Sequence, residues 1–344
     1  MSTEAIQRVE KAIEEIKRGR MVIMMDDEDR ENEGDLVYAA TFSTPDMVNF
    51  MAKEARGLIC TPITKERAAK LDLMPMVDNN ISNHETAFTV SIDSANAETG
   101  ISAAERNDCI SKLANPLTVA EDFVRPGHIF PLIAKDGGVL VRTGHTEGSV
   151  DICKLAGLAP AAVICEIIKD DGKMARKDDL EIFSQKYDMP IVYISDIVEY
   201  RLANEKLVRR ISTQESELKG MKVEKIVYSD HLDRTHTIIQ FYKLHETANV
   251  KFHNIGRDVD LILDDKRFSA LDHAIEYLKH NGGILVFLDT KTISQEQAKE
   301  FGVGAQILKD LGIKNINLLT SNKETEFVGL SGFGLDVVEK IEVV

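Results

Sequence analysis

An acidic segment near the start of the chain gathers the side chains with the clearest chemical potential. Seven carboxylates fall within ten residues, in the run Asp26-Asp27-Glu28-Asp29-Arg30-Glu31-Asn32-Glu33-Gly34-Asp35. Carboxylates at this density repel one another unless a cation neutralises them, and clustered hard oxygen ligands suit Mg²⁺ or Mn²⁺. A solvated acidic hairpin would carry the same charges. The segment alone therefore indicates either a metal site or an exposed connection between two strands.

A second candidate site is the run Arg142-Thr143-Gly144-His145-Thr146. We expect it between a strand over residues 138–142 and a helix over residues 147–156. Backbone N–H groups and the dipole at the start of a helix favour an anion, and an arginine adds a bidentate phosphate contact. The run is typical of a small phosphate site in which His145 could also ligate a metal. A turn of this composition also occurs for structural reasons alone.

Two further polar residues have unusual sequence surroundings. Glu166 interrupts the apolar run 161–168, and a carboxylate buried on such a strand has a raised pKa that suits general acid/base work. If the strand lies at a sheet edge, Glu166 simply faces water. His128 lies in Arg125-Pro126-Gly127-His128, a segment stiffened by Pro and Gly, where the alternative is a hydrogen-bonded structural histidine.

The chain that positions these groups has the composition of an ordinary globular protein. Its 344 residues are 43% hydrophobic and 29% charged, with a net charge of −15, which argues against nucleic acid as a partner. No apolar run reaches the roughly 18 residues of a membrane span, and the N-terminus lacks a signal-peptide pattern. We therefore expect a cytoplasmic protein without a membrane partner. Its four cysteines form no CxxC pair and are predicted to be buried free thiols: Cys60, Cys109, Cys153 and Cys165.

Alternating strand and helix patterns predict an α/β protein layered around mostly mixed or parallel sheets. An amphipathic helix opens the chain, with apolar residues at helical spacing from Ile6 to Ile16. Strands are predicted over residues 21–25, 36–40, 162–168, 190–194, 222–228, 237–244, 284–288 and 315–320. Helices are predicted over residues 270–279 and 305–311. The charged, helix-prone stretch 196–217 marks the junction between a first domain, 1–205, and a second domain, 206–344.

With these residues assembled, the first part closely resembles 3,4-dihydroxy-2-butanone 4-phosphate synthase, the enzyme that supplies the four-carbon unit of riboflavin. The resemblance covers roughly residues 1–205. It rests on the acidic segment, Gly100-Ile101-Ser102-Ala103-Ala104, Arg125 to His128, Arg142 to Thr146, and Cys165-Glu166. It implies a three-layer α-β-α domain with a mixed sheet, usually a homodimer. It also implies conversion of D-ribulose 5-phosphate to L-3,4-dihydroxy-2-butanone 4-phosphate and formate with a divalent metal.

The resemblance also implies roles for individual residues. Glu31 and His145 look like the ligands of Mg²⁺ or Mn²⁺, with two ions per subunit. Glu166 and His128 look like the residues needed for proton transfer, and Cys60 matches a family cysteine near the site. The residues implied to bind substrate are Arg30, Glu31, Asp35, Arg142, Thr143, Gly144, His145, Thr146 and Glu166. The reaction passes through enediol chemistry, which needs acid/base groups beside a Lewis acid that stabilises developing oxyanions.

One departure from the family pattern follows Ala104. The family usually reads Asp-Arg and then threonines, whereas this chain reads Glu105-Arg106-Asn107-Asp108-Cys109. A phosphate contact from this loop is therefore not implied for this chain, whereas the implied metal site is unaffected.

The second part resembles GTP cyclohydrolase II in its frame, through residues 301–312 and 318–335. The three zinc-binding cysteines of that family are missing, since no cysteine follows Cys165. Zinc would generate the attacking hydroxide, so we expect no zinc and no ring opening of GTP. The family's Arg- and Gly-rich loop is replaced at residues 287–292, and residues 323–325 are also altered. The glycine-dense run 329–334 is weak as a cofactor motif.

Two histidines of the second part, His231 and His236, fit no metal-ligand spacing and are predicted to be structural or surface residues. We therefore expect a synthase with one activity, carrying a degenerate cyclohydrolase-like domain that serves structure, dimer contacts or regulation. A bifunctional enzyme that also acts on GTP is the first alternative. A non-catalytic scaffold for pathway partners is the second.

Overall fold

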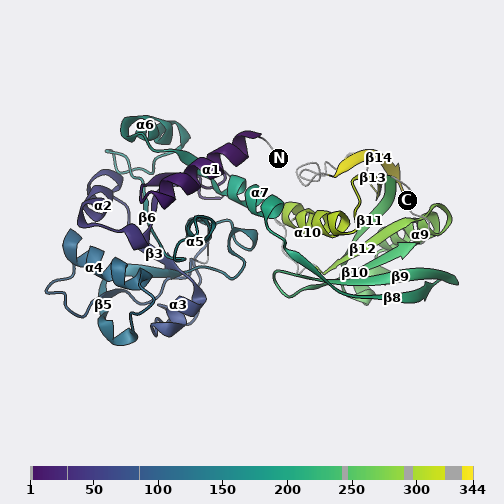
Figure 1. Ribbon diagram of the computed structural model, residues 1–344, viewed down its shortest axis with the longest axis horizontal. Coiled ribbons are helices and arrows are strands. Elements are labelled where there is room, and N and C mark those ends of the chain that lie inside the picture. Colours follow the sequence, from purple (N-terminus) through teal and green to yellow (C-terminus); the bar gives the residue numbers. More distant parts are fainter. Residues whose placement is uncertain are drawn as a thin grey trace. The chain divides into compact units, whose positions relative to one another are not determined.

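The computed structural model describes residues 3–28, 30–84, 86–241, 247–289, 297–321 and 335–343. The chain divides into two compact units, residues 3–200 and residues 201–344. Each unit contains a seven-stranded sheet with helices packed on it (Figure 1). This arrangement confirms the predicted α/β class. The division lies within helix α7 (Ile194–Asn204), and the domain limits 1–205 and 206–344 stay a prediction.

The first unit is built on a mixed sheet with strand order β4-β5-β3-β6-β2-β1-β7. Its strands are β1 (Val22–Met25), β2 (Gly34–Ala39), β3 (Cys60–Ile63), β4 (Ile92–Ser94), β5 (Phe123–Ile133), β6 (Ala162–Glu166) and β7 (Ile191–Tyr193). The pairs β1-β7 and β3-β5 are parallel, and the other pairs are antiparallel. Besides α7, its helices are α1 (Thr3–Lys17), α2 (Pro45–Phe50), α3 (Lys65–Lys70), α4 (Ala103–Ala114), α5 (His145–Leu155) and α6 (Lys177–Tyr187).

Both faces of this sheet are covered by helices. On β1, Val22 and Met24 belong to a core cluster with residues of α1, α5 and α7. Their neighbours Ile23 and Met25 belong to a second cluster with residues of α2, α4 and α6. Since successive side chains of a strand point to opposite faces, the sheet lies between two helical layers. The three-layer α-β-α arrangement is therefore confirmed.

The predicted opening helix is α1. Its apolar stripe, which includes Val9, Ile13 and Ile16, is buried against the sheet. The chain turns at Gly19, where φ is +72°, a conformation that glycine adopts without a side-chain penalty. The helix delivers the chain into β1 and so fixes where the acidic segment leaves the sheet.

The second unit has a mixed sheet of strand order β14-β13-β11-β12-β10-β9-β8. Its strands are β8 (Val208–Leu218), β9 (Met221–Asp230), β10 (Thr235–Phe241), β11 (Thr247–Ile255), β12 (Gly283–Asp289), β13 (Asn315–Thr320) and β14 (Asp336–Glu342). Its helices are α8 (Asp258–Ile262), α9 (Asp265–Asn281) and α10 (Gln297–Asp310). Residues of α9 pack on one face of the sheet with Leu285, and residues of α10 pack on the other with Ile284 and Val286.

Two predicted elements are wrong. The stretch 196–217 is helical only as far as Asn204, because pairing with β9 along β8 outweighs the helix preference of these residues. The strand predicted over 138–142 is instead a short 3₁₀ turn, Gly138–Leu140. Gly137 and Gly138 have φ of 90° and 63°, which a strand does not accommodate.

The four cysteines are buried and free, as predicted. In the described part of the chain, no helix is long and apolar enough to cross a membrane. The runs 323–325 and 329–334, together with residues 290–292 of the replaced loop, lie outside the described residues.

Candidate functional site

A cavity of about 480 Å³ opens in the first unit where the start of β2, the end of β6 and the start of α5 meet. Residue types for metal, phosphate and proton chemistry all border it. Its lining residues are Arg30, Glu31, Glu33, Asp35, Cys60, His84, Thr86, Phe88, Leu132, Arg142, His145, Thr146, Ile164 and Glu166.

Most of the residues that the sequence assigned to substrate and metal meet at this cavity. Those that line it are Arg30, Glu31, Asp35, Arg142, His145, Thr146 and Glu166. Thr143 and Gly144 lie in the adjoining loop, where Gly144 is the N-cap of α5. His128 lies on β5, outside the lining set. The functional roles of these residues stay predictions.

The acidic segment folds around the carboxylate of Asp26, which is almost fully buried at the end of β1. Asp26 Oδ2 accepts hydrogen bonds from Arg30 Nη1 at 2.7 Å and from the backbone N–H of Glu31 at 3.1 Å. Its Oδ1 accepts one from the backbone N–H of Glu33 at 2.8 Å. Because Asp26 accepts three hydrogen bonds from the loop, it holds the loop in shape and fixes the position of the Glu31 backbone. The segment is thus a folded loop over a cavity, in contrast to the solvated hairpin that the charges alone allowed.

Among the described residues, the donor atoms of Asp26, Glu31 and His145 lie within 4.8 Å of one another. His145 Nε2 lies 3.2 Å from the carbonyl oxygen of Met24, which can only accept, so Nε2 carries the proton and donates. Nδ1 therefore keeps its lone pair, 3.9 Å from Glu31 Oε2. Burial lowers the pKa of His145, so the ring is neutral at pH 7, as a metal ligand must be. These hard oxygen donors and one neutral imidazole fit a divalent cation such as Mg²⁺.

Two carboxyl groups at the cavity have raised pKa values, so their charged forms are disfavoured. Burial raises the pKa of Asp35 well above its ordinary value, and the nearby charges of Glu166 and Glu31 raise it further. Burial and the charge of Glu31 likewise raise the pKa of Glu33. Shifts of this kind, caused by burial and like charges beside a cavity, are typical of a functional site.

Glu166 is the last residue of β6, between β3 and β2, so the edge-strand alternative is wrong. It lies directly opposite Asp35 of β2 in the antiparallel register. Its Oε2 accepts a hydrogen bond of 2.8 Å from the backbone N–H of Leu58. A Cβ at Gly57 would lie 2.4–2.7 Å from Glu166 atoms, so only glycine lets this chain segment approach.

The guanidinium of Arg142 is held by an ion pair and hydrogen bonds to residues that no sequence pattern identified. Its Nη1 forms an ion pair of 2.6 Å with the carboxylate of Glu147, which is 1% exposed. Its Nε and Nη2 donate to the carbonyl oxygen of His84, and Nη2 also donates to Thr86 Oγ1. Glu147 additionally accepts a hydrogen bond from the backbone N–H of Lys135. His84 and Thr86 lie in a polar stretch without periodicity, which gave no signal of a cavity wall.

Cys60 forms part of the cavity wall. Burial raises the pKa of its thiol well above the ordinary value, and the charges of Glu166 and Asp35 add to the shift. The side chain is therefore a protonated thiol at neutral pH and packs as a small apolar group.

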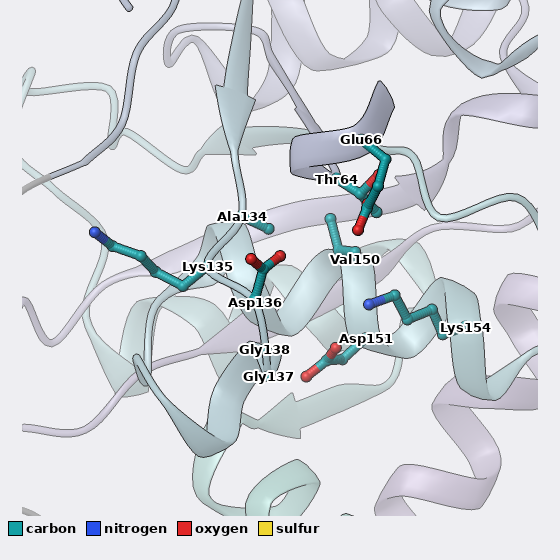
Figure 2. Close-up of a pocket in the computed structure, with 10 residues that line it drawn as sticks. All are labelled: Thr64, Glu66, Ala134, Lys135, Asp136, Gly137, Gly138, Val150, Asp151 and Lys154. Carbon is teal, nitrogen blue, oxygen red and sulfur yellow. The ribbon is translucent and has the colours of Figure 1, made fainter. Parts of the chain in front are cut away.

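A second cavity, of about 270 Å³, lies beside the 3₁₀ turn Gly138–Leu140 (Figure 2). Residues of α3, of the turn and of α5 line it, and none of the predicted site residues does. Asp151 Oδ2 accepts a hydrogen bond of 2.8 Å from the backbone N–H of Val139, so this buried carboxylate holds the turn in place. Figure 2 shows Lys135 extending away from the other lining side chains.

His128 pairs with a residue that the sequence did not single out. Its Nδ1 lies 2.8 Å from Asp93 Oδ2, and its backbone N–H donates to Asp93 Oδ1 at 2.8 Å. The His128 side chain is 44% exposed, whereas that of Asp93 is 10% exposed. His128 is therefore an oriented and accessible imidazole that does not line the cavity of its own chain.

Comparison with known proteins gives the family. A sequence model of 3,4-dihydroxy-2-butanone 4-phosphate synthase matches residues 10–200, and a model of GTP cyclohydrolase II matches residues 289–342. The chain is 57% identical over 336 residues to the 3,4-dihydroxy-2-butanone 4-phosphate synthase of Wolinella succinogenes, covering 98% of this chain and 97% of that protein.

Solved structures agree with this. The two-domain 3,4-dihydroxy-2-butanone 4-phosphate synthase RibBX from A. baumannii superposes with a TM-score of 0.82 at 37% identity, over 98% of this chain and 99% of that one. A 3,4-dihydroxy-2-butanone 4-phosphate synthase in complex with two magnesium ions matches with a TM-score of 0.54 at 40% identity, over 56% of this chain and 95% of that one. This chain belongs to the 3,4-dihydroxy-2-butanone 4-phosphate synthase family.

Proposed function

We propose that this protein converts D-ribulose 5-phosphate to L-3,4-dihydroxy-2-butanone 4-phosphate and formate, a step of riboflavin biosynthesis. The observation that carries the proposal is the convergence on one cavity of an anion-binding helix start, a metal-ligand set and two facing carboxylates. Family membership over nearly the whole chain supports the same reaction.

The phosphate of the substrate binds at the start of α5. Thr146 is in the first turn of this helix, where free backbone N–H groups and the helix dipole favour an anion. Arg142 lies beside it with one Nη1 hydrogen left over after its contacts with Glu147, His84 and Thr86. We assign the phosphate to Arg142, Thr146 and the loop Thr143 to His145, in which the backbone N–H of Gly144 already donates to the carbonyl oxygen of Arg142 at 2.9 Å.

The metal site consists of Glu31 and His145, with Asp26 holding the loop that carries Glu31. Mg²⁺ is the metal we propose, since a family member is described in complex with two magnesium ions. Mn²⁺ would suit the same oxygen ligands. A bound ion supplies Lewis-acid stabilisation of the oxyanions that develop during enediol formation. Arg30 beside Glu31 and Asp35 on β2 hold the sugar hydroxyls.

Proton transfer falls to Glu166 and His128. Glu166 borders the cavity, and its Oε2 is oriented by the backbone N–H of Leu58, which leaves Oε1 to face the substrate as far as the described residues show. Enediol formation moves a proton from carbon, which a positioned carboxylate can accept and return.

His128 reaches a cavity only if a second copy of the chain supplies it. Its strand and the flanking segments expose large apolar side chains that a second copy would cover: Ile101, Leu117, Val119 and Val124. We therefore propose a homodimer in which His128 of one copy faces the cavity of the other. Four free thiols suit the reducing cytoplasm, where we place the protein.

We propose that the second unit does not open the ring of GTP. The chain has no cysteine after Cys165 to hold the zinc that the cyclohydrolase reaction needs. A role in structure, dimer contacts or regulation is what remains for this unit.

Incubation of the purified full-length protein with D-ribulose 5-phosphate and Mg²⁺ tests the proposed reaction, with formate as the readout. We expect formate release that stops on addition of a chelator and returns with excess Mg²⁺. Protein that releases no formate, or releases it unchanged in the presence of chelator, would refute the proposal. Light scattering of the same sample tests the homodimer.

A further inference from the structure

The carboxylate of Asp93 contacts His128 at two nitrogens, the backbone N and the ring Nδ1. Asp93 Oδ1 accepts the backbone N–H of His128 at 2.8 Å, and Asp93 Oδ2 lies 2.8 Å from the ring Nδ1. Asp93 is only 7% exposed as a residue, so its charge is shielded from water, while the ring of His128 reaches the surface. A buried carboxylate bound to one nitrogen of an accessible imidazole is the arrangement that orients histidines in catalytic and metal sites.

Three local features bring Asp93 to this place. The register between β4 and β5 shifts between Ile92 and Asp93, an irregularity of the kind that re-aims a side chain. A Cβ at Gly127 would lie 2.0 Å from the carbonyl carbon of Ile92 and 2.2 Å from the nitrogen of Asp93. A Cβ at Gly100 would lie 2.0 Å from Asp93 Oδ2. The two glycines thus leave room for the carboxylate and for the close passage of the two strands.

We propose that Asp93 is the positioning residue that fixes His128 in one tautomer for proton transfer, an inference that rests on the proposed role of His128. An ionised carboxylate only accepts hydrogen bonds, so Nδ1 of His128 carries the proton and donates to Asp93. Nε2 then keeps its lone pair at the accessible side of the ring. It is the atom that takes a proton from the substrate and returns it.

The substitution Asp93→Asn separates this role from a purely structural one. The amide oxygen can still accept the backbone N–H of His128, so the strand contact is preserved. The amide NH₂ then faces Nδ1, turns Nδ1 into an acceptor and moves the ring proton to Nε2. We expect kcat to fall by about 10²–10⁴-fold while KM changes by less than about threefold, as for a proton-transfer histidine held in the wrong tautomer.

Ser94→Ala is the matched control. Ser94 is the next residue of β4, is 1% exposed, and its hydroxyl accepts hydrogen bonds from Lys112 Nζ and the backbone N–H of Asn96. This variant removes a buried polar contact at the same place without touching His128. We expect its kcat to stay within about twofold of the wild-type value, since no group that meets the ring is lost.

The tautomer is read directly by NMR of the full-length protein with ¹⁵N-labelled histidine, the His128 signals being assigned by their loss in His128→Asn. We expect an Nδ1-protonated ring in the wild-type protein and an Nε2-protonated ring in Asp93→Asn. The same tautomer in both proteins, or an unchanged kcat in Asp93→Asn where His128→Asn is inactive, would overturn the positioning role. Wild-type turnover in His128→Asn would instead overturn the proposed proton transfer by His128, and the NMR result would still decide whether Asp93 fixes the ring.

Discussion

Two buried aspartates, one in each unit, are held in opposite ways. Asp35 of β2 lies beside Glu166 and Glu31, and burial together with these like charges raises its pKa. Its contact with His145 is long, at 3.9 Å. Asp230 of β9 is equally buried. Burial would raise its pKa as well, but hydrogen bonds from His236, Arg234 and the backbone outweigh this and hold the pKa below its ordinary value.

The difference lies in the charges that surround each carboxylate. Around Asp230 in the second unit, opposite charges and hydrogen-bond donors surround the carboxylate. Asp230 accepts from Arg234 Nε at 2.6 Å, and the buried His236 accepts the backbone N–H of Asp289 at 3.1 Å. At the cavity of the first unit, the charges of neighbouring carboxylates raise the pKa values of Asp35 and Glu33. Like charges gathered at a cavity, more than polar composition, distinguish the unit with a candidate active site.

The largest expected effect is at the metal ligands. Glu31→Gln removes the charge of a proposed ligand, and we expect turnover to fall by more than about a hundredfold because the oxyanion loses its stabilisation. Mg²⁺ should also no longer raise the thermal unfolding temperature, as it does for a protein whose folded state alone binds the ion. His236→Asn in the second unit is the control. A Glu31→Gln protein that keeps both turnover and stabilisation by Mg²⁺ would break the assignment.

A smaller effect is expected at Glu147, which holds Arg142. Glu147→Gln removes a charge-assisted contact of the kind worth about 1.5–3 kcal/mol, and we expect KM for D-ribulose 5-phosphate to rise about tenfold or more with little change in kcat.

Asp196→Asn provides the matched control for Glu147→Gln. Asp196 forms an equally short pair with Arg8, at 2.7 Å, in the same unit but away from the cavity lining. Steady-state kinetics of the two variants should separate them, and an equal rise in KM for both would mean that the effect is a general loss of structure.

The smallest expected effects are opposite changes in stability at the two aspartates. Asp35→Asn removes a charge that the fold disfavours, so the unfolding temperature in chelator should rise by about 2–4 °C per kcal/mol gained. Asp230→Asn weakens the ion pair with Arg234, so the free energy of unfolding should fall by about 1–3 kcal/mol and the unfolding temperature should fall with it. Calorimetry of both variants tests this, and changes of the same sign would remove the contrast between the units.

The opposite pKa shifts of Asp35 and Asp230 also predict opposite effects of pH on stability. The pKa of Asp230 is lower in the folded state, so its contribution is present above the unfolded value of about 4 and is lost as the pH falls below it. The pKa of Asp35 is higher in the folded state, so the folded protein holds the extra proton and loses stability as the pH rises from about 4 through the folded pKa. Urea unfolding at pH 5 and pH 7 should therefore show a smaller loss of stability between these pH values for Asp35→Asn than for the wild-type protein.

Much of the fold was predictable from the sequence because its signals are local. The apolar stripe of α1, the short apolar runs of β1 and β6 and the Gly turn at Gly19 each specify their own element. The acidic segment was recognised by composition, although composition could not show that Asp26 folds the loop around its own carboxylate. The two wrong elements, at 138–142 and 205–217, are places where glycine conformation or strand pairing decided against local preference.

The supporting residues of the site could not be predicted in the same way. His84 and Asp93 act through contacts with residues 58 and 35 positions away, and no local pattern marks them. Glu147 lies only five residues after Arg142, but no sequence signal indicated that this carboxylate is buried against the guanidinium. His128 illustrates the opposite case, since its motif singled it out while the structure keeps it out of the cavity lining of its own chain. Sequence motifs therefore identified the groups proposed for the chemistry, and the structure was needed to find what holds them.

The contrast between the two units can be tested in one sample. The full-length protein is incubated with uniformly ¹³C-labelled D-ribulose 5-phosphate and unlabelled GTP in the presence of Mg²⁺ and Zn²⁺, and ¹³C-formate and the remaining GTP are followed together. We expect labelled formate to accumulate while the GTP concentration stays constant. Consumption of GTP without labelled formate would refute the proposed roles of the two units.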